Sequence, residues 1–188
     1  MGIRPGRCLP IHTIILVWIG LFYQFYEKKR LIMPIPALDA VDLKILRLLQ
    51  DDGRMSLADL AGKVGLSPSP CLRRVRLLEK SGVISRYVAV LDQRTVGLPV
   101  SVFISVKLEK QREELLDRFA KTIARWPEVL ECYLMTGPRD YWLRVVVPDL
   151  AAYERFLKQK LTRLEGIASI ESSFALEQVK YTNVLPIA

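Results

Sequence analysis

The sequence predicts an α+β fold, an N-terminal winged helix-turn-helix followed by a C-terminal ferredoxin-like βαββαβ sandwich. Three observations lead to it: three short helical patterns with a glycine-containing turn between the last two, a strict apolar alternation that starts at residue 100, and a strand-helix-strand order that occurs twice. The predicted organisation is a hydrophobic N-terminal extension (1–32), a helix-turn-helix with its linker (38–96), a sandwich domain (97–180) and a tail (181–188).

Composition and charge narrow the class of protein. Of the 188 residues 51% are hydrophobic, which is enough for ordinary folded domains. The net charge of +8 divides into +4 for residues 1–32, +3 for 33–96 and +1 for 97–188, so the basic excess of the predicted domains lies in the N-terminal one. This asymmetry is expected if that domain meets a polyanion and the other does not.

Catalytic and metal chemistry have few candidate residues. The cysteines Cys8, Cys71 and Cys132 are widely spaced, and no pair has metal-site or redox-motif spacing. The single histidine, His12, lies in the first apolar run, so the predicted domains contain no imidazole base or ligand. We therefore expect no catalytic residues, no cofactor and no metal site, and a reduced, cytoplasmic protein.

The N-terminal extension has two interpretations. Residues 9–26 carry no charge, and basic residues flank them on both sides, so the segment is a borderline membrane span. Alternatively, the start codon is misassigned and translation begins at Met33, five residues before the patterned domain starts at Leu38. The second interpretation is the one we expect.

The first two helices are delimited by capping residues. The first is predicted to begin after Asp39 and to end at Asp-Asp-Gly (51–53), and the second to begin after Ser56 and to end at Gly65. Their apolar stripes have helical spacing: Val41, Ile45, Leu48 and Leu49, then Leu57, Leu60, Ala61 and Val64.

The third helix carries the basic charge. It is predicted to begin at Pro68, with Ser67 as its cap, and to reach Lys80. Its inward face holds Cys71, Leu72, Val75 and Leu78, and its outward face holds Ser69, Arg73, Arg76 and Lys80, with Arg74 at the border. A solvated face usually mixes Glu and Lys, whereas this one is mostly arginine, which favours reading of double-stranded DNA.

A DNA-binding set follows from this face. We expect base contacts from Arg73 and Arg76 and phosphate contacts from Arg74 and Lys80. The full predicted set is Ser67, Ser69, Arg73, Arg74, Arg76 and Lys80. The β-rich residues 83–91 are predicted to form a wing or linking strand, in which Arg86 is placed to contact a phosphate.

The C-terminal domain is predicted from two strand-helix-strand units. The elements are a strand at 100–108, a helix with the stripe Leu116, Phe119, Ala120 and Ile123, a strand at 129–136, a strand at 141–147, a helix after Asp149 that stops at Gly166, and a strand at 167–176. Both helices lie on one face of the predicted sheet. Because no further helix is available for the other face, we expect a partner subunit to cover it.

At this point the residues resemble a known family. The segments LDAVDLKIL (38–46), VGLSPSPCLRRV (64–75) and ECYLMTG (131–137), the last followed by Asp140 and Tyr141, closely resemble the leucine-responsive and asparagine regulators (Lrp/AsnC). The similarity covers residues 38 to about 185. It implies a winged helix-turn-helix, a ligand-sensing domain, homodimers formed through the sheets, and higher assemblies such as octamers that wrap DNA.

The resemblance also implies an effector site at the turn 136–140. The residues concerned are Met135, Thr136, Gly137, Asp140 and Tyr141. An amino acid fits this turn if Gly137 exposes amide groups to its carboxylate and if Asp140, exposed on the turn, accepts from its ammonium group. An ordinary β-turn is the alternative, since Gly-Pro and Asp are common turn formers. Residues 138–139 (Pro-Arg) depart from the smaller and aromatic residues of the family, which leaves the ligand's identity open.

The predicted function is a sequence-specific transcriptional regulator that responds to a small effector, an amino acid. A membrane-tethered DNA-binding sensor is one alternative and depends on residues 1–32. An enzyme is another, because some relatives with ferredoxin-like sheets decarboxylate tetrapyrroles; the absence of histidine from the sensing domain argues against it.

We predict that the native protein begins at Met33, because the domain that starts at Leu38 needs no upstream residues and an apolar leader hinders a soluble oligomer. Peptide mapping of the protein from its native host tests this. Recovery of peptides from residues 1–32 contradicts it.

Overall fold

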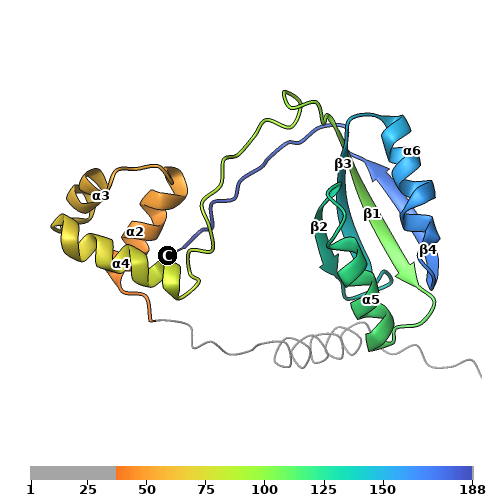
Figure 1. The fold of residues 1–188 in the computed structure, drawn as a ribbon, viewed down its shortest axis with the longest axis horizontal. Helices are drawn as coiled ribbons and strands as arrows, with labels where there is room; N and C mark the ends of the chain where they lie inside the picture. The colour runs from red at the N-terminus through yellow and green to blue at the C-terminus, as the bar shows by residue number, and fades with distance from the viewer. Residues whose placement is uncertain (1–36, 188) are drawn as a thin grey trace, which may run out of the picture. The chain divides into compact units, whose positions relative to one another are not determined.

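The computed structural model describes residues 37–187, so the predictions for the extension 1–32 lie outside the described residues. Within that range the chain forms two compact units (Figure 1). One contains residues 37–90 together with the last part of the chain, 178–187. The other contains residues 91–177.

The N-terminal unit is built on the three predicted helices α2 (Ala40–Asp51), α3 (Leu57–Val64) and α4 (Pro68–Lys80). Asp39 caps α2 in a reciprocal capping box with Asp42, and Ser56 caps α3 by accepting from the Asp59 N–H. Ser67 occupies the cap position of α4, but its side chain makes no capping hydrogen bond. The buried core contains Ile45, Leu46, Leu60, Ala61, Val64, Cys71 and Leu78.

The strand predicted at 83–91 is absent from the described chain, whose residues 85–91 have no regular secondary structure. The prediction was wrong because a strand needs a hydrogen-bonded neighbour, and no described segment pairs with this one. Its apolar side chains Tyr87, Val88, Val90 and Leu91 remain exposed. High β-propensity alone therefore did not make the segment a strand.

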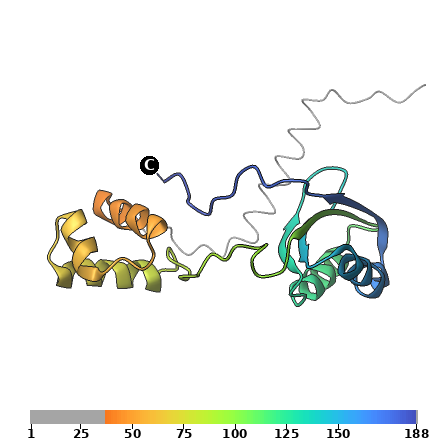
Figure 2. The same ribbon diagram turned by 90° about the horizontal axis from the view of Figure 1, so that it is seen from above.

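The C-terminal unit is a four-stranded antiparallel sheet with the order β2-β3-β1-β4. The strands are β1 (Val100–Leu108), β2 (Val129–Leu134), β3 (Tyr141–Val147) and β4 (Ile167–Phe174), so β2 and β4 each end two residues before their predicted limits. Helices α5 (Glu113–Ile123) and α6 (Leu150–Gln159) lie on the same face of the sheet (Figure 2). The predicted βαββαβ sandwich is confirmed.

The core of this unit lies between the helices and the sheet. The helix-facing side chains Val102, Ile104 and Val106 of β1 are completely buried, and Leu143 and Val145 of β3 lie beside them. A short 3₁₀ helix (Leu161–Arg163) adds Leu161 to the same core. Within residues 91–177, no helix covers the opposite face of the sheet (Figure 2).

The glycines of α3 provide a stability test. Gly65 ends the helix with φ of +77°, so Gly65→Ala should destabilise the unit by about 1 kcal/mol through backbone strain. Gly62 lies inside α3 with open space around its Cα, so Gly62→Ala should stabilise the unit by about 0.5 to 1 kcal/mol. Thermal and urea unfolding of both variants measures these changes. The reverse order of stability contradicts the assigned end of α3.

Candidate functional site

The outward face of α4 is a strip of exposed basic side chains. Cys71 and Leu78 anchor the other face of the helix in the core. Five predicted DNA-binding residues are exposed: Ser67, Ser69, Arg73, Arg76 and Lys80. Within residues 37–187 the structure gives Arg73, Arg76 and Lys80 no hydrogen bond or ion pair, so their charges are available to a ligand. The helix therefore presents cations that the fold does not use.

Arg74 has a different environment. Its Nη1 lies 2.7 Å from Asp39 Oδ2 and 2.8 Å from Asp42 Oδ1, in the first turn of α2. The Asp42 backbone N–H, and after it the Arg74 guanidinium, hold the pKa of Asp39 below its ordinary value of 3.8. The pKa of Arg74 is raised by the same two carboxylates. Arg74 thus joins the start of α2 to α4, which sets the orientation of the basic helix.

The predicted effector turn connects β2 to β3. Gly137 has a φ of +116°, a region that residues with a Cβ rarely adopt, as the sequence indicated. The Met135 N–H donates to the Asp140 carbonyl at 2.8 Å, and the Asp140 N–H donates to the Val106 carbonyl at 2.9 Å. Arg139 reaches β4, where it donates to Ser169 Oγ at 2.8 Å and pairs with Glu171. The turn is therefore fastened to both β1 and β4.

The prediction of an exposed carboxylate at Asp140 was wrong. Asp140 is 4% exposed. Its Oδ2 accepts from the Leu108 N–H and its Oδ1 accepts from Gln111 Nε2, both at 2.6 Å. A buried carboxylate requires such donors, and here they tie the turn to the end of β1. The carboxylate supports the turn from beneath instead of facing the solvent.

Tyr141 also points into the core. Its ring stacks on Phe119 with the centroids 4.4 Å apart, and its hydroxyl donates to the Leu116 carbonyl at 2.8 Å. Burial raises the pKa of the Tyr141 hydroxyl, which stays protonated. Of the predicted effector residues, Met135 and Thr136 are exposed and Gly137 is half-buried, while the side chains of Asp140 and Tyr141 lie below the surface.

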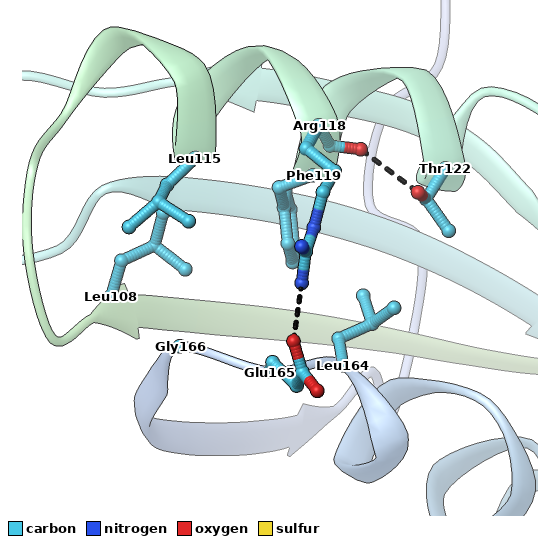
Figure 3. Close-up of a pocket in the computed structure, with 8 residues that line it drawn as sticks. All are labelled: Leu108, Leu115, Arg118, Phe119, Thr122, Leu164, Glu165 and Gly166. Atoms are coloured by element: carbon cyan, nitrogen blue, oxygen red, sulfur yellow. Dashed lines mark hydrogen bonds and ion pairs between the residues drawn. The ribbon is translucent and has the colours of Figure 1, made fainter.

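A small cleft lies elsewhere in the same unit, between α5 and the segment before β4 (Figure 3). It offers about 20 Å³, little more than the space for one water molecule. The Arg118 to Glu165 ion pair, at 2.9 Å, spans it from the solvent side. This cleft is too small to hold an amino acid.

The uncovered face of the sheet is aromatic at its centre. Phe103 and Trp142 stack with their centroids 4.8 Å apart, and the Tyr133 ring lies 6.1 Å from Trp142. Beside them Arg144 donates to Glu131 and to Gln93, each at 3.1 Å. A flat apolar patch with a satisfied polar margin has the composition of a subunit interface.

Two of these interactions were missed from the sequence. The helical pattern placed Arg74 at the border of the basic face but gave it no partner, although Asp39 and Asp42, at i and i+3 before an apolar stripe, formed an acidic first turn that a cation can meet. No sequence signal distinguished the buried Asp140 from an ordinary turn residue.

Comparison with known proteins assigns each of the two units to a domain family. Residues 38–85 match a winged helix-turn-helix DNA-binding domain, and residues 101–185 match the Lrp/AsnC ligand-binding domain. The chain is 53% identical to the Bkd operon transcriptional regulator of Pseudomonas aeruginosa over 150 residues, which are 80% of this chain and 98% of that protein. The chain belongs to the Lrp/AsnC family. The leucine-responsive regulatory protein of Haemophilus influenzae is 42% identical over 159 residues, 85% of this chain and 93% of that one.

Solved structures of similar regulators share the fold of this chain. A transcriptional regulator of Neisseria meningitidis, in complex with L-methionine, is 39% identical with a TM-score of 0.75 and covers 79% of this chain and 96% of its own. An AsnC family regulator from Agrobacterium tumefaciens is 49% identical, with the same TM-score and coverage. These relatives are transcriptional regulators. The protein is an effector-responsive, DNA-binding transcriptional regulator.

Within residues 37–187, no helix is long and apolar enough to span a bilayer. The tethered alternative concerns residues 1–32 and lies outside this range.

The burial of Asp140 predicts how its substitution changes the stability of the C-terminal unit. Asp140→Ala should destabilise the C-terminal unit by about 2 to 3 kcal/mol, because it leaves the buried Leu108 N–H without its acceptor. Asp140→Asn, which keeps one acceptor oxygen, should lose less. Urea unfolding measures both, with Glu109→Ala on the exposed surface as the control. Wild-type stability of the alanine variant contradicts the supporting role.

Proposed function

We propose that α4 of this cytoplasmic Lrp/AsnC regulator reads base edges in the major groove of DNA through Arg73 and Arg76. Lys80 contacts a phosphate, and Ser67 and Ser69 contact the backbone near the start of the helix. The observation that carries the proposal is the exposed, unpaired state of the three cations on a helix whose other face is fixed in the core. Arg74, which Asp39 and Asp42 already bind, is removed from the predicted phosphate contacts.

Alanine variants of three of these cations should affect DNA binding in different ways. Arg73→Ala should cost about 1 to 3 kcal/mol of binding and relax sequence preference, because a base contact is lost. Lys80→Ala should weaken binding to all sequences alike and lower the salt slope by about one unit. Arg74→Ala should lower the unfolding temperature and leave the salt slope unchanged, because its charge is used within the domain.

Binding titrations at several salt concentrations measure these effects, using a duplex that the wild-type protein selects from a random library. Unchanged binding by the Arg73 and Lys80 variants means that another face of the domain meets DNA. A reduced salt slope for Arg74→Ala contradicts the assignment of its charge to the pairs with Asp39 and Asp42.

The effector is proposed to be an amino acid bound at the turn 136–140. The support is the Gly137 backbone, which frees main-chain amides for a carboxylate, and the exposed Met135 side chain, which offers an apolar contact. The ammonium group then donates to main-chain carbonyl oxygens or to the Thr136 hydroxyl oxygen, since the Asp140 carboxylate is already engaged. The similar Neisseria meningitidis regulator, whose structure contains L-methionine, supports this class of ligand.

The subunits are proposed to dimerise through the uncovered sheet face and to assemble further, as in an octamer. The aromatic group of the half-buried Phe103 and Trp142 and the exposed Tyr133 supports this, because apolar rings left partly open to water are costly in a monomer. An effector that binds one assembly better than another shifts the population by no more than its differential affinity.

Variants of the exposed turn residues test the effector site. Met135→Ala and Thr136→Ala should lower amino-acid affinity while DNA binding without effector and thermal stability stay unchanged, because both side chains are exposed. Calorimetry against an amino-acid panel, with oligomer size followed by light scattering, measures the response. Lys121→Ala on the exposed surface of α5 is the control. Absence of binding by the wild type, or a full response in both variants, contradicts the site.

A further inference from the structure

The C-terminal end of the chain binds to a helix of the DNA-binding unit. Gln50 on α2 contacts the main chain of Leu185 on both sides: its Nε2 donates to the Leu185 carbonyl at 3.3 Å, and its Oε1 accepts from the Leu185 N–H at 2.6 Å. Arg47 Nε donates to the Ile187 carbonyl at 3.3 Å, one helical turn away. The contact joins residues about 140 positions apart in the sequence.

An apolar contact accompanies these hydrogen bonds. Ile187 packs against the core of the helical unit, in which Ile45 and Leu46 of α2 are buried. A side-chain amide that satisfies both main-chain groups of one residue replaces the neighbour that an extended segment lacks. The tail is thus held by two polar side chains and one apolar side chain, and it leaves the basic face of α4 uncovered.

The tail starts where the sheet ends. It follows β4 directly, and the last residue of β4, Phe174, pairs with Val102 near the beginning of β1. The Ala175 N–H continues this pairing by donating to the Ser101 carbonyl at 3.0 Å. The other connection between the units enters β1 at Val100. Both connections therefore leave the sheet at the ends of neighbouring strands.

The length of the tail limits movement when its end is bound. Residues 178–184 lie between the sheet unit and the Leu185 contact, and seven extended residues span at most about 25 Å. The linker side is also short, because turn hydrogen bonds hold residues 92–98 and Gln93 binds Ser101. A bound tail thus adds a second tether, which reduces the positions the helix-turn-helix can explore.

We propose that the α2 surface formed by Arg47, Gln50 and the neighbouring core is the docking site for the chain's own C-terminal segment, residues 185–187. The docked segment restricts the helix-turn-helix and thereby strengthens binding to DNA that two such domains must occupy at once. The docking is inferred from the contacts of Arg47, Gln50 and Ile187. Its effect on DNA binding rests on the dimer and on the α4 contacts proposed for this protein.

A single backbone change tests the docking. Leu185→Pro removes the N–H that donates to Gln50, and an extended segment accommodates proline. Val184→Pro is the matched control, because the Val184 N–H donates only to Thr182 within the tail. Hydrogen exchange of the full-length protein should be faster over residues 184–187 and over α2 in Leu185→Pro, and wild-type in Val184→Pro. Truncation after residue 183 should reproduce the faster exchange of α2. Wild-type exchange of α2 in both Leu185→Pro and the truncated chain overturns the docking.

Two DNA probes test the effect of the tether. Both derive from a duplex that wild-type protein selects from a random library: one contains two half-sites and the other only one. Leu185→Pro should lose about tenfold in affinity for the two-site duplex and less than twofold for the single site, because only the first requires two domains placed together. Equal affinities of wild type and Leu185→Pro for the two-site duplex, or equal losses on both duplexes, overturn the tether. If wild-type protein selects no duplex, the proposed DNA contacts fail, while the exchange experiment still decides the docking.

Crosslinking identifies which tail is bound. With Gln50→Cys and Leu185→Cys in a Cys8→Ser, Cys132→Ser background, which leaves the buried Cys71 as the remaining native thiol, oxidation should give a product of monomer size on a denaturing gel. A product of dimer size shows that α2 binds the tail of a second copy and overturns the assignment to the chain's own segment.

Discussion

The position of strand β1 between β3 and β4 is the constraint on which the C-terminal domain depends. Its helix-facing side chains are completely buried and its main chain pairs on both sides, so it cannot shift without opening the core. The candidate effector turn is fastened to its far end through the Val106 carbonyl and the Leu108 N–H. The linker and the tail meet at its near end. One strand thus joins the sensing turn to both connections with the DNA-binding unit.

In the helix-turn-helix, ion pairing distinguishes the arginine that holds two helices together from the arginines that are free to bind DNA. Arg73, Arg74 and Arg76 are neighbours in sequence and identical in chemistry. Arg74 faces two aspartates at the start of α2, and the other two face solvent. An arginine whose hydrogen bonds are already satisfied gains little from a phosphate, whereas an unpaired one gains the full interaction and releases counterions. The same residue type therefore serves orientation at one position and DNA binding at its neighbours.

Local signals explain why most of the fold was predictable. Capping residues, helix-ending glycines and the alternation at 100–108 act over a few residues, and each agrees with the others. The strand predicted at 83–91 had the composition of a strand but lacked a partner among the described residues, and α6 ends at Gln159, before its predicted stop at Gly166. A strand forms only when a neighbouring segment supplies hydrogen-bond partners, and the composition of one segment does not show whether that neighbour exists. The Gly137 turn was located for the same local reason as the helix ends, since a positive φ favours glycine.

The sequence by itself determined the two domains, the exposed basic face of α4 and the place of the candidate effector turn, because these depend on periodicity and on the conformational preference of single residues. Only the tertiary structure decided which polar side chains were already engaged. Arg74 meets Asp39 and Asp42, Asp140 lies beneath its turn, and Gln50 holds Leu185. Each of these contacts joins residues from about 30 to 140 positions apart, and no local pattern encodes such a distance. The physical reason is that a polar group bonds to whichever partner the folded chain brings within hydrogen-bonding distance.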